Sequence, residues 1–438
     1  MGFNLKDLES EILDQYFEKN QRPWILGFSG GKDSTMLLQV VWNTLKSVRQ
    51  APKERDIYVV CNNTLVENPK IIEYTEKVLD KIQEEASKQN LPFKVVRTTP
   101  RLEDSFWTNL IGKGYPAPNN MFRWCTERLK INPTTKFIKE KIDETGEVII
   151  LLGTRSDESS ARARSIKKHE VTGQRLRKHV LPNAYVYAPI KDVTIDELWQ
   201  YLLQVSSPWG SNNKELVTIY RNANSGDCPL VIDDSTPSCG NSRFGCWVCT
   251  VVTKDRSMEA LIENGEEWME PLMELRDLLS ASREDRDKRE TKRRNGMSGA
   301  DIWGPYTPAF RAEFLDKLLR AQKEIQSVQR DITLINYQEL VAIQVLWYRD
   351  NIFNFNVADI YNNIYGTDIQ LENGNQAIKK EKELLKKVCK ESEDFELINE
   401  LLALQKTKTL LMTNRGLQND LENKLDDFIS SRDVKDVS

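Results

Sequence analysis

Short apolar runs alternate with longer amphipathic stretches along the first half of the chain. The apolar runs are each typical of a buried strand and lie at 24–28, 57–61, 93–98, 148–152 and 184–187. Helical spacing of apolar residues marks the stretches at 1–20, 35–45 and 69–89. Strands alternating with helices predict an α/β fold, with a doubly wound, mostly parallel sheet that helices cover on both faces.

Strand patterns end at about Thr253, and only helical periodicity follows. It marks residues 257–279, 308–332, 336–350 and 376–404. We therefore predict an α/β domain over residues 1–225, a cysteine-rich segment over 226–254 and a helical domain over 255–438. The chain contains no apolar run of about 18 residues, and its first residues lack the apolar core of a signal peptide. These features predict a cytoplasmic protein that does not enter a membrane.

Charge is nearly balanced overall but uneven locally. The formal net charge is −4, yet residues 161–180 hold seven Lys and Arg against one acid, Glu170. This surplus indicates either a phosphate-binding surface or a solvated loop. The chain has two histidines, His169 and His179, both in this stretch. This argues against a His-based nucleophile triad or a His-rich metal site, and leaves acid–base chemistry to carboxylates, Lys, Cys or metal-bound water.

A Ser- and Gly-rich turn separates the first predicted strand from the helix that follows it. This 29–35 loop reads Ser29-Gly30-Gly31-Lys32-Asp33-Ser34-Thr35. Adjacent glycines allow the backbone to approach a ligand closely, and the N–H groups at the start of the helix favour an anion. Lys32 and the three hydroxyl groups add donors, while Asp33 is a candidate metal ligand beside phosphates. The spacing differs from the G-x-x-x-x-G-K-[ST] loop of common NTPases.

Four of the seven cysteines lie close together and are candidate ligands of an inorganic centre. They are Cys228, Cys239, Cys246 and Cys249. A [4Fe–4S] cluster takes four thiolates without tight local pairing, whereas zinc sites usually pair two short C-x-x-C turns. One such turn and two isolated cysteines favour the cluster over zinc, and a disulfide is a third possibility.

Cys125 stands apart, in the segment Cys125-Thr-Glu-Arg128-Leu-Lys130. Basic neighbours lower the pKa of a thiol, so we predict a reactive thiolate here. The alternative is a buried cysteine that acts as a small apolar side chain.

Several of these segments together resemble the PAPS-reductase branch of the ATP pyrophosphatase (PP-loop) superfamily, over roughly residues 20–205. The resemblance rests on the 29–35 loop, the strand-end segment Asn62–Pro69, the Cys125 segment and Gly153-Thr-Arg155-Ser-Asp-Glu158-Ser159-Ser-Ala-Arg162. It implies an enzyme that splits ATP, with Mg²⁺, into AMP and pyrophosphate. It places ATP on the 29–35 loop and Gly153, and catalysis on Lys32, Asp33 and Cys125. The residues it implies for a substrate phosphate are Arg128, Lys130, Arg155, Glu158, Ser159 and Arg162.

With the four cysteines and the helical tail, the whole chain resembles the DndC family of DNA phosphorothioation sulfurtransferases, which serve DNA modification and antiphage defence. That resemblance implies a [4Fe–4S] cluster on the four cysteines and sulfur in place of a non-bridging oxygen of a DNA phosphate. It implies as partners DNA, a cysteine desulfurase that donates sulfur, and other proteins of the phosphorothioation system. A sulfonucleotide reductase, an RNA thiolase and a nucleotide-binding scaffold are the alternatives. The reductases carry a cysteine in a short C-terminal tail, which the end of this sequence does not match.

Overall fold

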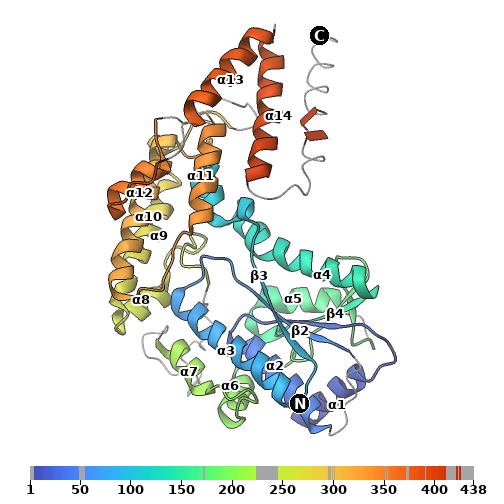
Figure 1. Cartoon of the computed structure of the whole chain (residues 1–438). Helices are drawn as coiled ribbons and strands as arrows, with labels where there is room; N and C mark the ends of the chain where they lie inside the picture. The colour runs from blue at the N-terminus through green and yellow to red at the C-terminus, as the bar shows by residue number, and fades with distance from the viewer. Residues whose placement is uncertain are drawn as a thin grey trace. The chain divides into compact units, whose positions relative to one another are not determined.

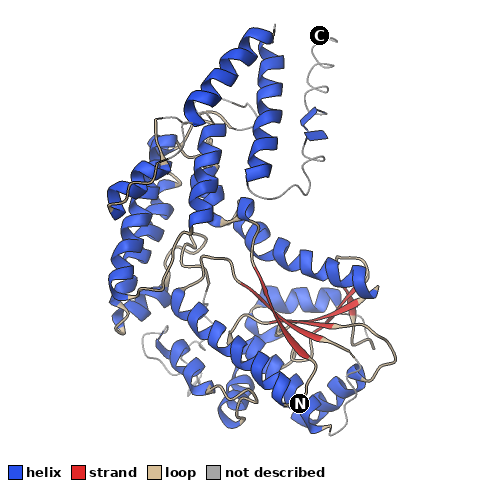
Figure 2. Cartoon of the chain, viewed as in Figure 1, coloured by secondary structure: helices blue, strands red, loops and turns tan. Residues whose placement is uncertain are grey.

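The computed structural model describes most of the chain. The described residues are 4–48, 55–170, 173–222, 245–293, 297, 299, 301–350, 352, 354–370, 374–389, 391–410, 421, 422, 424 and 425. Their contacts divide them into two compact units, one of residues 1–100 and 118–276 and the other of residues 101–117 and 277–438. Figure 1 shows the elements of both units, and Figure 2 shows all the strands gathered in one sheet, with helices elsewhere.

The first unit is built on a six-stranded, mostly parallel sheet with the order β3-β2-β1-β4-β6-β5. The strands are β1 (Trp24–Gly27), β2 (Ile57–Asn62), β3 (Phe93–Thr98), β4 (Val148–Leu151), β5 (Arg177–Lys178) and β6 (Ala184–Tyr187). The strand pairs are parallel except β5 with β6, which is antiparallel. The predicted mostly parallel α/β sheet is therefore confirmed. The two-residue edge strand β5 was not predicted, because no apolar run marks it in the sequence.

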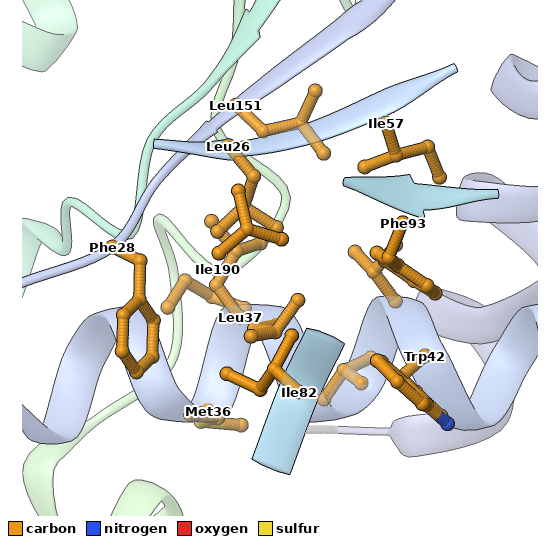
Figure 3. Close-up of a cluster of buried hydrophobic side chains, with 14 of the residues drawn as sticks. Leu26, Phe28, Met36, Leu37, Trp42, Ile57, Ile82, Phe93, Leu151 and Ile190 are labelled. Carbon is orange, nitrogen blue, oxygen red and sulfur yellow. The ribbon is translucent and has the colours of Figure 1, made fainter. Parts of the chain in front are cut away.

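Helices cover both faces of the sheet because successive strand residues point to opposite sides. The helical elements of this unit are α1 (Leu5–Tyr16), α2 (Lys32–Ser47), α3 (Pro69–Lys88), η3 (Thr126–Ile131), α4 (Asn132–Thr145), η4 (Ser156–Glu158), α5 (Ser160–His169), α6 (Ile195–Gln204), α7 (Asn213–Asn222), α8 (Arg256–Glu263) and η6 (Glu267–Met269). Leu26 of β1 packs with Leu37 of α2 and Ile82 of α3 in the larger core (Figure 3). Ile25 points the other way, into a core with Phe137 and Ile138 of α4.

Strand order fixes where a ligand can bind. The chain runs from β1 to β2 and β3 on one side, and then returns to add β4 on the other side of β1. Trp24 of β1 pairs with Ile57 of β2 and with Ile149 of β4 in parallel register. In such sheets a crevice opens at the carboxyl ends of the two strands where the order reverses. The segments that follow β1 and β4 therefore come together, and they are the 29–35 loop and residues 152–159.

The second unit is helical in its described residues. Its elements are η1 (Leu102–Asp104), η2 (Thr108–Gly112), α9 (Glu270–Ser282, within which the boundary falls), η7 (Arg286–Lys288), α10 (Pro308–Val328), α11 (Tyr337–Arg349), α12 (Val357–Tyr365), α13 (Gly374–Val388) and α14 (Ser392–Leu410). No helix in the described ranges is long and apolar enough to cross a bilayer. The predicted helical region is confirmed, although the helix expected over 376–404 is two helices, α13 and α14. The second starts at Ser392, where Glu393 and Asp394 suit a helix N-terminus.

Residues 101–117 belong to the helical unit because buried donors bind their carbonyl groups. Arg311 of α10 donates through Nε to the Ile111 carbonyl (2.7 Å) and also binds the Gly112 carbonyl. The indole N–H of Trp347 donates to the same Ile111 carbonyl (2.9 Å). Trp107 returns a hydrogen bond to the Leu334 carbonyl (2.7 Å). The Arg311 and Trp347 donors satisfy carbonyl groups at the end of the π-helical turn η2, because no further helical turn follows that would supply N–H groups to them.

Glu339 is a buried carboxyl in the first turn of α11. It accepts a hydrogen bond from the Asn336 N–H (3.2 Å) and its own N–H donates to the Asn336 side chain (2.9 Å), which makes a capping box. Its side chain is nearly inaccessible, and one oxygen has no hydrogen-bond partner among the described residues. Burial raises the pKa of Glu339 from 4.5 to about 7, against the lowering effect of hydrogen bonds from Ser105 and Asn336.

The raised pKa predicts that stability falls as the pH rises from about 4.5 to about 7. The folded protein holds the Glu339 proton more tightly than the unfolded chain does. The protonated carboxyl therefore contributes its full stability below the pKa of the unfolded chain, and this contribution is lost as the pH rises to the pKa of the folded protein. Relative to Glu339→Gln, the unchanged protein should lose up to about 3 kcal/mol across this range. Thermal unfolding of both proteins measures the difference, and parallel pH profiles would contradict the assignment.

Candidate functional site

The 29–35 loop connects β1 to α2 and leaves the start of that helix open to a ligand. Gly30 has a φ of +74°, in the left-handed region that glycine adopts readily. The N-cap is Gly31, which has no side chain, whereas Asn4, Asn68 and Thr194 cap α1, α3 and α6 with side-chain oxygens. First-turn N–H groups of α2 are therefore positioned to bind an anion, together with the positive end of the helix dipole.

Two serine hydroxyls hold the 29–35 loop in shape. The Ser29 N–H donates to Ser34 Oγ (3.2 Å), and the Gly31 N–H donates to Ser29 Oγ (3.4 Å). Ser34 Oγ in turn donates to the Gly31 carbonyl (3.0 Å). Thr35, on the next helical position, is buried and its hydroxyl has no hydrogen-bond partner among the described residues. The loop is thus preorganised by its own side chains.

Tyr220 of α7 is a residue of this site that the sequence analysis missed. The Lys32 N–H donates to the Tyr220 hydroxyl (3.3 Å), and the Lys32 ammonium lies 5.1 Å from the centre of the ring. The Tyr220 side chain is buried, and burial raises the pKa of its hydroxyl. Its ring packs edge-on against Trp199. A tyrosine inside an amphipathic helix gives no sequence signal for such a role.

An ion pair between buried Arg155 and partly buried Asp33 joins the 29–35 loop to the segment after β4. Arg155 is 2% exposed and donates through Nε to Asp33 Oδ1 (2.5 Å) and through Nη1 to the Val193 carbonyl (3.1 Å). The other Asp33 oxygen lies 3.4 Å from the Lys32 ammonium. Gly153 packs directly against the backbone of Asp33. A Cβ added to Gly153 would lie only 2.9 Å from the Asp33 carbonyl oxygen. Close packing and charge therefore hold the two segments together.

The other residues of the 153–162 signature surround this pair. Glu158 accepts a hydrogen bond from the Arg155 N–H (2.8 Å) and lines the cavity described below. Ser159 is exposed, and its carbonyl accepts from the Ala163 N–H (2.9 Å) in the first turn of α5. The Arg162 side chain lies outside the described residues.

A cavity of about 900 Å³ opens over the 29–35 loop at the carboxyl ends of β1, β2 and β4. Polar residues from distant parts of the first unit line it, among them Lys32, Asp33, Glu67, Lys130, Arg155 and Tyr220. Apolar residues line it as well, including Ile71 and Leu216. Its position is the one that strand order predicts for a ligand.

The Cys246–Cys249 turn lies beside one wall of this cavity. Glu67 and Cys246 form an antiparallel β-bridge, and the Trp247 N–H donates to the Val66 carbonyl (3.0 Å). The Cys246 sulfur lies 3.4 Å from Thr64 Oγ1 and 3.8 Å from Glu67 Oε1. Burial, with the charge of Glu67, raises the pKa of the Cys246 thiol to about 12. A segment far along the chain is thus fixed to the residues that follow β2.

An arginine supports the other side of this turn. The Cys249 N–H donates to the Cys246 carbonyl (3.0 Å), and the Arg276 side chain binds the carbonyls of Cys249 (3.1 Å) and Val252. The predicted ligands Cys228 and Cys239 lie outside the described residues. Within the described ranges, no three Cys, His, Asp or Glu side chains gather as a metal site, and every described cysteine is a free thiol.

Cys125 and Lys130 of η3 adjoin the same turn. The Lys130 ammonium lies 3.7 Å from Glu67, and its pKa is raised chiefly by the Cys246 thiol, with smaller contributions from Glu67, Cys125 and Cys249. The expectation of an acidic Cys125 thiol is wrong. Burial, with the charge of Cys249, raises the pKa of Cys125, and this outweighs the lowering effect of Lys130. Arg128 is partly buried in the same π-helical turn.

Gly153→Ala should strongly weaken anion binding at the 29–35 loop, for which ATP is a probe, because the new methyl group would push the backbone of Asp33 and Ser34 out of place. Gly245→Ala is the matched control, since its added Cβ would meet nothing within 4 Å and Gly245 does not line the cavity. Titration calorimetry with ATP measures both variants, and circular dichroism checks that each is folded. Equal affinities in the two variants would contradict the close packing described here.

Part of this chain is similar to known proteins. The model of the phosphoadenosine phosphosulfate reductase domain family matches residues 23–252. A curated relative, an uncharacterised protein of Methanocaldococcus jannaschii, is 28% identical over 198 residues, which are 45% of this chain and 35% of that protein. The chain thus spans about a third of the length of this relative.

Solved structures with similar folds include two enzymes. Phosphoadenylyl-sulfate reductase from Candida auris matches 46% of this chain and 88% of its own (TM-score 0.27, 10% identity). U34-tRNA thiolase from Methanococcus maripaludis, solved with its [4Fe–4S] cluster, matches 50% and 73% (TM-score 0.26, 16% identity). The family model covers more than half of the 438 residues, including the 29–35 loop and the 153–162 segment. This chain belongs to the phosphoadenosine phosphosulfate reductase domain family.

Proposed function

We propose that this protein is a DNA phosphorothioation sulfurtransferase. It splits ATP into AMP and pyrophosphate to adenylate a DNA backbone phosphate, and sulfur then replaces a non-bridging oxygen of that phosphate. The main support for the proposal is that one wall of the cavity also contacts the neighbouring cysteines. Glu67 and Lys130 line the cavity over the 29–35 loop, and the same two residues contact or electrostatically couple to the cysteines beside it.

The 29–35 loop suits the pyrophosphate half of ATP. Open N–H groups at the start of α2 and the Lys32 ammonium would bind the β- and γ-phosphates. Mg²⁺ usually takes one or two carboxylates and completes its shell with phosphates and water. Asp33 Oδ2, which does not bind Arg155, would supply such a carboxylate. Charge that develops on departing pyrophosphate is then stabilised by groups already in place.

The cysteine side of the cavity suits a thiolate-bound cluster. Cys246 and Cys249 project from one tight turn, with Trp247 and Val248 buried between them. Thiolates in a partly apolar setting fit a [4Fe–4S] cluster, whose remaining ligands we assign to Cys228 and Cys239. When bound, the cluster would supply a site for handling sulfur or electrons near the cavity. Glu67, Thr64 and Arg276 would orient the turn that holds it.

The acceptor phosphate would enter from the side of α5. Helix α5 begins two residues after Glu158, which lines the cavity. Its Arg164, Lys167 and Lys168 are exposed. Basic side chains on one exposed helix supply sequence-independent contacts with a DNA backbone, which agrees with chemistry on the backbone itself.

The proposed reaction has two displacements. A non-bridging DNA oxygen attacks the α-phosphorus of ATP, the bond to the β-phosphate oxygen breaks, and pyrophosphate leaves. A sulfur nucleophile then attacks the DNA phosphorus, and AMP leaves with that oxygen. We assign this sulfur to a persulfide on Cys125, loaded by a cysteine desulfurase, with two electrons from an external thiol to release it. Other proteins of the phosphorothioation system would present the DNA in the cytoplasm.

A second candidate is sulfonucleotide reduction, which the family match favours. Such an enzyme transfers the sulfo group of its nucleotide substrate to a thiol and does not split ATP. Release of sulfite from a sulfonucleotide and a thiol reductant would support this alternative.

Incubation of the anaerobically purified protein with ATP, Mg²⁺ and DNA should release AMP and pyrophosphate. Lys32→Ala should lower this rate by about 100-fold or more, because it removes a positive charge placed for the leaving group. Lys46→Ala is the control, since Lys46 is exposed in the last turn of the same helix. Chromatography identifies the nucleotide product, and ADP in place of AMP would contradict the proposal.

Three cysteine variants separate the two halves of the reaction. Cys246→Ser should lose bound iron and phosphorothioate formation, yet release pyrophosphate. Cys125→Ser should hold about four irons per chain and release pyrophosphate, but form no phosphorothioate. Cys389→Ser, altered in a linker between α13 and α14, should behave as the unchanged protein. Metal analysis and mass spectrometry of digested DNA measure these outcomes, and stoichiometric zinc would overturn the cluster assignment.

A further inference from the structure

A threonine hydroxyl of α3 lies at the 29–35 loop without a hydrogen-bond partner. Thr75 is 3% exposed, and its Oγ1 is buried and unpaired among the described residues. It lines the same cavity as Gly30, Gly31 and Lys32. The sequence offers no signal for it, since it lies within a helix and outside every motif.

Thr75 directly contacts the turn that is expected to bind phosphate. A Cβ built on Gly30 would lie 2.2 Å from Thr75 Oγ1 and 3.2 Å from Thr75 Cβ. The hydroxyl therefore faces the Gly30 Cα. Close approach of α3, together with the positive φ, is why residue 30 has to be glycine. The hydroxyl thus lies at the loop itself, not elsewhere along the cavity.

A buried hydroxyl without a partner is costly to the folded protein. The Thr35 hydroxyl of the same loop is also buried without a partner among the described residues, whereas Ser29, Ser34 and Tyr220 each bond to a loop N–H group. A phosphate oxygen on the loop would accept the Thr75 proton, and such charge-assisted bonds are about twice as strong as neutral ones. Ligand binding would therefore satisfy a group that the protein alone leaves unsatisfied.

We propose that Thr75 is a pyrophosphate-binding residue, whose Oγ1–H donates to a β- or γ-phosphate oxygen of bound ATP. This inference rests on the proposed function, which places ATP on the 29–35 loop. Because Gly30 covers the hydroxyl, the proposal requires that phosphate entry move the Gly30–Gly31 turn away from α3, against the hydrogen bonds that Ser29 and Ser34 make to this turn. Thr75 thus belongs to the phosphate subsite although it lies 40 residues beyond the loop.

Replacing Thr75 by valine tests the assignment, because valine keeps the shape and removes the hydroxyl. Thr44→Val is the matched control. Thr44 is also buried with an unpaired hydroxyl, on α2, but does not line the cavity. Both variants should unfold at a higher temperature than the unchanged protein. Thr75→Val alone should bind magnesium pyrophosphate about tenfold more weakly or worse.

Titration calorimetry on the full chain, with pyrophosphate, ATP and adenosine as probes, distinguishes the outcomes. Thr75→Ser should restore pyrophosphate affinity, and adenosine should bind all variants equally. Unchanged pyrophosphate affinity in Thr75→Val, or an equal loss in Thr44→Val, would overturn the assignment and leave the proposed function intact. If the unchanged protein binds neither ATP nor pyrophosphate, both the assignment and the proposed function fall.

Discussion

The ion pair between buried Arg155 and partly buried Asp33 is the contact that joins two walls of the cavity. A guanidinium group that is 2% exposed needs a charged partner, and loss of Asp33 should cost less than the roughly 3–5 kcal/mol typical of a fully buried pair, because Asp33 is 23% exposed. Asp33 starts α2 after β1, and Arg155 follows β4. The pair therefore connects the two segments that strand order brings to one edge of the sheet.

The same edge of the sheet also positions the cysteines. Residues after β2 form the wall at Glu67, and the Cys246–Cys249 turn is bonded to that wall by a β-bridge. A parallel sheet thus gathers three strand ends, and each contributes one part of the proposed chemistry. β1 contributes the 29–35 loop, β4 contributes Arg155, and β2 contributes the contact with the thiols. This arrangement is the physical reason to propose nucleotide activation and sulfur transfer in one unit.

Local patterns predicted the parts of this arrangement that depend on local physics. Apolar runs identified five of the six strands of the sheet, and the Gly30–Gly31 turn before a helix identified the loop. Packing between distant segments had no such signal, so Thr75, Tyr220 and the place of residues 101–117 in the helical unit came only from the structure. Cys125 shows why the pKa of a side chain could not be predicted from its sequence neighbours. Counting its basic neighbours gave the wrong direction for its pKa, because burial outweighs the nearby charge.

In the proposed reaction a DNA phosphate oxygen attacks the α-phosphorus of ATP in the cavity over the 29–35 loop. DNA labelled with oxygen-18 at its non-bridging phosphate positions would reveal this attack. Mass spectrometry of the released AMP should find one oxygen-18 atom for each sulfur incorporated, because AMP leaves with the displaced DNA oxygen. AMP without label, or with an oxygen taken from labelled water, would contradict the account.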